Sequence, residues 1–140
     1  MALTQNIEVK AQIEGRHYTR KSAGTDVLYK SALVNTVLAS GKLVVAADTA
    51  GHAFAGYVDE YVSAVVDTDV KISKGGVAWF AHTGAALTDM DKPVWATGDD
   101  TLTITPATNV LACGVIEDVD VIGARWLVNF DKAQTRDITT

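Results

Sequence analysis

The sequence has almost no cysteine. Cys113 is the single cysteine among 140 residues, so no disulfide can form within the chain. One cysteine also cannot build a cysteine-based zinc site. Because disulfide frameworks are typical of oxidising compartments, this composition predicts assembly in a reducing cytoplasm.

Long hydrophobic runs are missing as well. Gly, Asp, Lys or Thr interrupts every apolar stretch, so no segment has the length of a membrane span. The first ten residues, MALTQNIEVK, lack the basic and apolar regions of a signal peptide. We therefore expect no membrane partner. With 48% hydrophobic residues, the chain still has enough apolar material for the core of one domain.

Positive charge is scarce and lies at one end of the chain. Residues 1–22 carry a net charge of +2 and the whole chain carries −5, so residues 23–140 carry −7. Nucleic-acid binding needs a positive surface, and we therefore expect no nucleic-acid partner. Residues 1–25 also hold few apolar side chains, which predicts an extended N-terminal arm rather than part of the core.

From residue 26 onward, short apolar runs alternate with turns rich in Gly, Asp and Thr. This spacing predicts an all-β fold, a small antiparallel β-barrel or sandwich with short helical turns. We expect its body over residues 26–132, between the arm at 1–25 and a C-terminal tail at 133–140. The expected strands lie within the runs 43–47, 55–66, 70–72, 77–81, 93–97, 101–105, 110–116 and 124–130.

Two segments have some helical character. In residues 28–40, Leu33 and Val37 are four apart and Gly41 follows as a helix-ending glycine. The β-branched residues of the same segment favour a strand equally, so both interpretations stay open. Residues 84–91 can form one helical turn before Pro93.

Two of the expected strands, 43–47 and 77–81, are apolar on both sides. Such a strand either is central in a sheet or covers a second face at a subunit contact. The three tryptophans also lie in apolar strands, which favours the core or a subunit interface over a sugar-binding platform. We place the subunit interface at Trp79, Trp95 and Trp126.

The sequence contains no complete catalytic or metal-binding motif. Its histidines are far apart and are expected to be solvated, and its paired aspartates lack the other ligands of a calcium loop. Aspartates of this kind usually accept local backbone hydrogen bonds in turns. The histidines are His17, His52 and His82, and the pairs are Asp67 and Asp69, Asp89 and Asp91, Asp99 and Asp100, and Asp118 and Asp120.

Nucleophile and phosphate-binding signatures are incomplete too. Cys113 lies among apolar residues, which indicates a buried small side chain rather than a reactive thiol. No serine stands in a G-x-S-x-G elbow, and no glycine pair continues into a P-loop. We expect no enzymatic activity, no cofactor and no bound metal.

The order of the segments is more specific than any one of them. Over residues 38–130 the chain contains SGKLVVAAD, FAGYVDEYV, VKISKGGVAWFA, DMDKPVWATGDDTLTIT, NVLACGVIEDVD and ARWLVNF. This series resembles the small capsid cement, or head decoration, proteins of tailed bacteriophages. The matching positions are Gly41, Gly56, Gly76, Lys92, Pro93, Val94, Trp95, Asp99, Asp100, Thr101, Gly114, Val115, Trp126, Leu127 and Val128. Asp91 stands where the family pattern often has glycine.

The resemblance implies a non-enzymatic virion protein on the exterior of the phage head. Such a protein binds the major capsid protein, cements its subunits and stabilises the expanded capsid. The resemblance also favours a homotrimer, with a dimer as the alternative, assembled in the host cytoplasm. A β-barrel module that binds carbohydrate or another ligand is the alternative function.

The basic arm is the expected capsid contact. We place that contact at Arg16, Tyr18, Arg20 and Lys21. Segments that fold on binding can cover a wide surface, which suits a protein that spans two capsid subunits. A second interpretation stays open, in which the arm is an edge strand of its own subunit.

Overall fold

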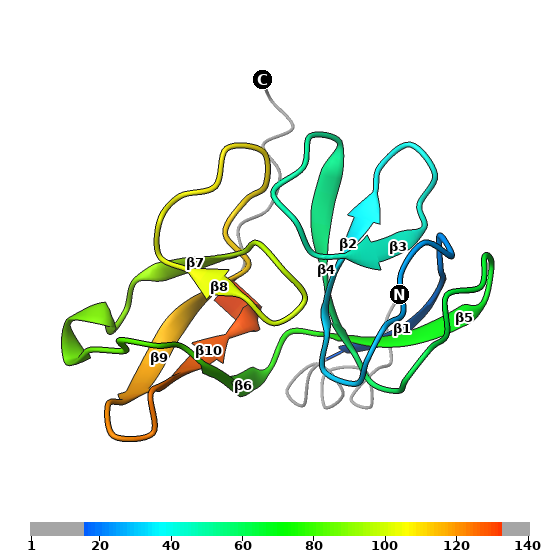
Figure 1. The fold of residues 1–140 in the computed structure, drawn as a ribbon. Coiled ribbons are helices and arrows are strands. Elements are labelled where there is room, and N and C mark those ends of the chain that lie inside the picture. Colours follow the sequence, from blue (N-terminus) through cyan, green and yellow to red (C-terminus); the bar gives the residue numbers. More distant parts are fainter. Residues whose placement is uncertain (1–15, 133–140) are drawn as a thin grey trace, which may run out of the picture.

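Residues 16–132, which the computed structural model describes, form two antiparallel five-stranded sheets that pack as a sandwich and do not close into a barrel (Figure 1). The all-β prediction is therefore confirmed. In spatial order, the first sheet contains β1 (Arg16–Lys21), β5 (Asp69–Lys74), β4 (His52–Val58), β2 (Leu33–Val37) and β3 (Leu43–Val45). The second sheet contains β6 (Val77–Ala81), β10 (Arg125–Asn129), β9 (Gly114–Asp120), β7 (Pro93–Ala96) and β8 (Leu102–Thr103).

Strand β2 is buried on both faces and joins two clusters of apolar side chains. Leu33 and Val34 both have no exposed surface, and as successive strand residues they point to opposite sides. Leu33 belongs to the cluster around Trp126 of the second sheet, whereas Val34 packs with Ile72 inside the first sheet. This two-sided burial explains the ambiguous pattern of residues 28–40, which contain a strand and no helix.

The first sheet curls around its own apolar cluster, and the residue that follows β1 reaches the start of β3. Ser22, directly after β1, forms an isolated bridge with Leu43 at the start of β3. The N–H of Ala23 donates to the carbonyl oxygen of Leu43 at 3.0 Å. The register between β2 and β4 also shifts after Val34, which lies opposite Gly56, and such bulges increase the local twist. The sheet therefore curves strongly but remains open.

Two short 3₁₀ helices complete the fold, η1 (Leu87–Asp89) and η2 (Phe130–Lys132). Helix η1 lies within residues 84–91, where a helical turn was predicted, so that prediction is confirmed. Asp91, two residues later, has a φ of 65°, in the left-handed region that glycine favours and aspartate tolerates. Asp91 therefore has a backbone conformation that is typical of glycine.

Both strands that are apolar on two sides are edge strands. β6 is outermost in the second sheet, and β3 is outermost in the first. On β6, Val77 is 54% exposed and Trp79 is 41% exposed. A central position is therefore wrong for both strands, and apolar surface stays uncovered on β6 within residues 16–132.

Of the two interpretations of residues 1–25, the edge strand is the one that the structure shows over the part it describes, and the extended arm is wrong there. Arg16–Lys21 forms β1, which pairs with all six residues of β5 at the edge of the first sheet. Backbone hydrogen bonds hold an edge strand, so this segment joins the sheet without many apolar side chains. Ser22 is 1% exposed, and the folded body therefore begins before residue 26. Residues 1–15 and the tail at 133–140 lie outside the described residues.

Candidate functional site

Trp126 belongs to the core, not to a subunit interface. It has no exposed surface, and its Nε1 donates a hydrogen bond to Oδ2 of Asp89 at 3.1 Å. The ring of His82 stacks on the indole with 3.6 Å between ring centroids. The predicted interface role of Trp126 is therefore wrong, because its strand points this side chain inward. His82 is likewise half-buried rather than solvated.

The other two tryptophans do not form one platform. Trp79 lies on β6 and is partly exposed, with the guanidinium of Arg125 at 4.5 Å from its ring centroid. Trp95 is half-buried on β7, and β10 and β9 lie between it and β6. A sugar-binding surface made of all three tryptophans is therefore absent from the described part of the chain. Trp79 alone presents a large aromatic surface at a sheet edge.

The predicted capsid-contact residues share one strand but differ in availability. Tyr18 is 39% exposed on β1 and can contact a partner. Arg20 is half-buried and its Nη1 donates to Oγ1 of Thr36 at 3.1 Å. Lys21 donates to Asp69 at 2.6 Å, and this hydrogen bond raises the pKa of Lys21 above its ordinary value. For Arg16 the structure describes only the strand position.

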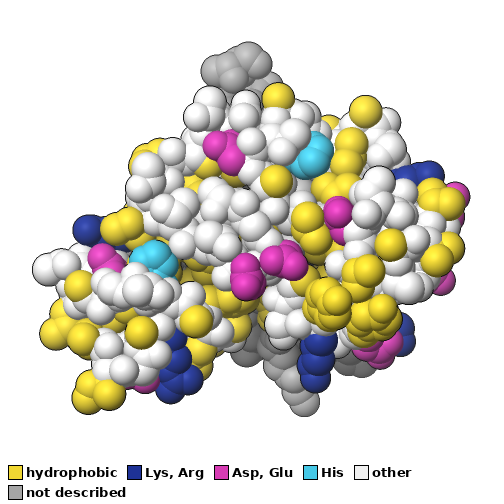
Figure 2. All heavy atoms as spheres, viewed as in Figure 1, with side chains coloured by type: hydrophobic (Ala, Val, Ile, Leu, Met, Phe, Trp, Pro, Cys, Tyr) yellow, Lys and Arg dark blue, Asp and Glu magenta, His cyan; other side chains and the backbone are white. Residues whose placement is uncertain are grey.

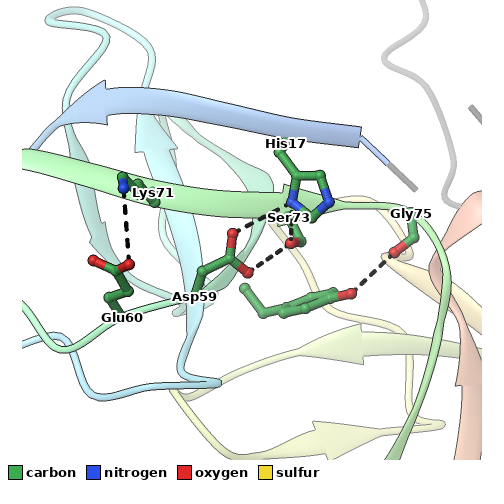
Figure 3. A network of polar contacts seen from close by, with 7 residues as sticks. His17, Asp59, Glu60, Lys71, Ser73 and Gly75 are labelled. Atoms are coloured by element: carbon green, nitrogen blue, oxygen red, sulfur yellow. Dashed lines mark hydrogen bonds and ion pairs between the residues drawn. The ribbon is translucent and has the colours of Figure 1, made fainter. Parts of the chain in front are cut away.

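A polar cluster at the β1–β5 edge brings together a serine, a histidine and an aspartate (Figure 3). The hydroxyl of Ser73 donates to Oδ1 of Asp59 at 2.6 Å and lies 2.9 Å from Nδ1 of His17. The same Nδ1 lies 3.4 Å from Oδ2 of Asp59. A hydrolytic triad instead places histidine between the other two, with one ring nitrogen for each. Here the serine donates to the carboxylate, so the cluster connects strands and does not activate a nucleophile.

No pattern along the chain indicated this cluster. His17 and Ser73 are 56 residues apart and meet because they lie opposite each other in the β1–β5 register. Beside the cluster is a shallow hollow of about 260 Å³. Its lining residues are His17, Tyr18, Thr19, Asp59 and Lys71. Burial and the charge of Asp59, a member of the cluster, raise the pKa of Tyr57.

Aspartates of the predicted pairs organise turns and strand ends. Asp120 accepts hydrogen bonds from the Gly123 N–H at 2.9 Å and from Nε of Arg125 at 3.0 Å, and these bonds lower its pKa. Asp89 is 7% exposed and accepts from the Ala86 N–H at 2.9 Å, which is the main reason that its pKa is lowered. The structural interpretation is confirmed for these two residues.

Metal and thiol chemistry find no support within residues 16–132. The described part of the chain contains no group of three or more His, Cys, Asp or Glu side chains that could hold a metal ion. His52 is half-buried, and its Nδ1 has no hydrogen-bond partner among the described residues. Cys113 has no exposed surface, and burial raises its pKa to about 12, so its prediction as an inert core residue is confirmed. Among the same residues, no helix is long and apolar enough to cross a membrane.

Exposed apolar side chains lie over both sheets instead of in one pocket (Figure 2). On the first sheet, Tyr29 and Tyr61 form a pair with 5.7 Å between ring centroids, and both are more than half exposed. On the second sheet, β6 and the β9–β10 turn carry exposed apolar residues. These residues are Val77, Trp79, Val121 and Ile122.

The described residues thus form a β-sandwich that exposes apolar side chains on both sheets, and they bring together no hydrolytic triad and no metal-binding cluster. No known protein-family model matches the chain, and no curated protein sequence matches it.

Proposed function

We propose that this chain is a structural protein of a tailed-bacteriophage head, which binds the outside of the capsid and cements subunits of the major capsid protein. The ordered series of segments over residues 38–130 carries this proposal. Each segment of the series contains a strand of the sandwich, from β3 in SGKLVVAAD to β10 in ARWLVNF. The segment VKISKGGVAWFA holds β6 and all but the first residue of β5, which belong to different sheets, so the series includes strands of both sheets.

The sandwich has the physical properties that a cementing protein requires. Two apolar clusters and pairing along ten strands give a stiff body, which can hold two other proteins at a fixed separation. Its exposed apolar side chains lie on both sheets, so it can contact more than one neighbour at once. The protein acts by binding alone, and its partner is the major capsid protein at the capsid exterior.

We place the capsid contact of the basic segment at the outer surface of β1. Tyr18 is available there, whereas Arg20 and Lys21 already have partners in their own subunit. A capsid carboxylate can share Lys21 with Asp69, since that lysine is exposed. The exposed charges make this contact sensitive to salt.

Self-association is part of the proposal. The resemblance favours a trimer at three-fold junctions of the capsid lattice, and a dimer on two-fold positions is the alternative. A two-fold dimer uses the same surface of both subunits, whereas a trimer needs two different surfaces that fit each other.

Cosedimentation with capsids tests the function. Expanded heads of the cognate phage, prepared without this protein, are mixed with the purified chain and pelleted. We expect saturable binding and a higher temperature of head disruption. Tyr18→Glu is expected to weaken binding, and Tyr29→Glu, at an exposed tyrosine in the segment between β1 and β2, serves as the control. Absence of binding to both expanded and unexpanded heads would overturn the proposal.

A carbohydrate-binding module is the second candidate. The exposed Trp79 beside Arg125 is the observation in its favour, because sugar rings stack on exposed aromatic faces. A glycan array read together with quenching of tryptophan fluorescence distinguishes the two functions. A saturable glycan signal that Trp79→Ala abolishes favours the module.

A further inference from the structure

The four outer strands of the two sheets differ in how well they resist pairing with another strand. Natural proteins protect such edges by short strands, charged residues, prolines or covering segments. β1 carries Arg20 and Lys21, β8 is two residues long, and β3 is three residues long and bridged to Ser22. β6, with the sequence VAWFA, has none of these features. Within residues 16–132 it pairs only with β10.

The hydrogen bonds at the two ends of β6 show which backbone groups face outward. Gly76 and His82 both bond to the β10 side, at 2.8 and 2.9 Å. In an antiparallel ladder, alternate residues direct their backbone groups to the same neighbour, so even-numbered residues of β6 face β10. The N–H and C=O groups of Val77, Trp79 and Ala81 therefore lie on the free edge.

β6 is also complementary to itself. In an antiparallel pair centred on Trp79, Val77 of one copy lies opposite Ala81 of the other, and Ala78 lies opposite Phe80. Each of these pairs matches a large side chain with a small one. The two Trp79 side chains lie opposite each other, and aromatic cross-strand pairs are stabilising. No charged residue of β6 opposes another, because the strand has none.

We propose that β6 pairs with β6 of a second copy of this chain, antiparallel and about a two-fold axis at Trp79. In this register every outward N–H and C=O of Val77, Trp79 and Ala81 meets its complement on the partner strand. The second sheet of one copy and the second sheet of the other then form one continuous sheet. The contact is isologous and closes at a dimer, which selects the two-fold over the three-fold alternative.

The turn between β9 and β10 extends this surface. Ile122 is 99% exposed and Val121 is 51% exposed at its tip. The turn lies beside the end of β6, since the carbonyl oxygen of Ala124 accepts the N–H of His82. In the dimer this apolar turn lies beside one end of the strand pair, so any part of it that the second copy covers loses contact with water. Hydrophobic burial then adds to the backbone pairing.

Sedimentation equilibrium of the full-length chain tests the proposal. We expect a dimer at micromolar concentration, and a monomer for Trp79→Glu, because two carboxylates would then face each other across the axis. Tyr18→Glu is the matched control, since Tyr18 is 39% exposed and Trp79 is 41% exposed on edge strands of the two sheets. This control is expected to remain dimeric.

A backbone variant separates strand pairing from side-chain contact. Ala81→Pro removes an N–H that faces the free edge, so it leaves the β6–β10 ladder intact. We expect it to fold, with an unchanged near-ultraviolet circular dichroism spectrum, and to dissociate at least tenfold more readily. Added salt is expected to preserve or strengthen the dimer, because it screens the repulsion between two acidic bodies.

Three outcomes overturn the pairing of β6. They are a wild-type monomer at high micromolar concentration, a wild-type trimer, and a dimer that both β6 variants retain. A wild-type monomer whose capsid binding is abolished by Ala81→Pro would assign the edge to a strand of the capsid protein instead. The inference does not rest on the capsid function, since it is measured on the free protein.

Discussion

The indole Nε1 of Trp126 donates a hydrogen bond to the Asp89 carboxylate at 3.1 Å, joining β10 to the short helix η1. The same carboxylate accepts the Ala86 N–H at 2.9 Å. One nearly buried aspartate thus accepts hydrogen bonds from a core tryptophan and from the backbone of a turn. This contact fixes the η1 turn against the inner face of the second sheet.

Replacement of Asp89 by alanine is expected to destabilise the fold by about 2 kcal/mol or more, because it leaves the Trp126 indole N–H without its acceptor. Urea denaturation monitored by Trp fluorescence measures the loss. Asp100→Ala, in an exposed turn, is the control and should change stability by less than about 0.5 kcal/mol. An equal effect of the two substitutions would contradict the assignment.

The lowered pKa of Asp89 makes the stability of the fold depend on pH. Its pKa in the folded state is below the ordinary value of 3.8, so the folded chain binds this proton more weakly than the unfolded chain. The contribution is fully present above pH 3.8 and is lost as the pH falls through the lower folded-state pKa. We expect Asp89→Asn to reduce the fall of the free energy of unfolding at acid pH, measured by urea titrations between about pH 5 and 2. An unchanged dependence on acid pH would show that other carboxylates dominate the loss of stability.

The bulge of β4 depends on glycine at position 56. Gly56 has a φ of 141°, and a Cβ there would overlap the carbonyl oxygen of Ser73. Gly56→Ala is therefore expected to lower the free energy of unfolding by more than about 2 kcal/mol, from backbone strain and steric overlap together. Gly51→Ala is the control, because its φ is 82° and nothing lies within 4 Å of its added Cβ. Thermal unfolding of both variants decides whether close approach adds to backbone strain.

Cys113 is expected to be inert in the folded protein. Its pKa of about 12 keeps the thiol protonated at neutral pH, and the side chain has no exposed surface. A thiol-reactive chromophore should label it only as fast as the chain unfolds, and rapidly in denaturant. Cys113→Ser should destabilise the fold by about 1 to 3 kcal/mol, because it buries a hydroxyl among apolar side chains. Rapid labelling under native conditions would disprove this burial.

Deletion of residues 1–22 is expected to weaken the fold itself. It removes β1, whose six residues pair with β5, and the buried Ser22 that meets β3. We expect the free energy of unfolding to fall by on the order of 2 kcal/mol or more. Deletion of residues 1–15 retains β1 and is the comparison that isolates binding by the N-terminal segment. An unchanged denaturation midpoint after the longer deletion would contradict the structural role of β1.

The fold class followed from local patterns in the sequence. Turn residues between short apolar runs determine where strands end, so the predicted run 77–81 coincides with β6 and the run 93–97 contains β7. The burial of Cys113 was predictable for the same reason, since apolar neighbours surround it. These features depend on residues close together in the chain.

Strand neighbours were decided only by tertiary structure. β1 joins β5 through backbone hydrogen bonds, which any side chains permit, so the polar sequence RHYTRK left open whether the segment is an arm or an edge strand and did not indicate its partner. The meeting of His17 with Ser73 follows from that pairing. Trp79 and Trp126 show the same limit, because both lie in strands of similar apolar pattern. Trp126 is buried and Trp79 is exposed because they point to opposite faces of the second sheet. Trp126 lies opposite Phe80 on the inner face and Trp79 lies opposite Leu127 on the outer face, and strands with apolar residues on both sides did not indicate which face would be inner.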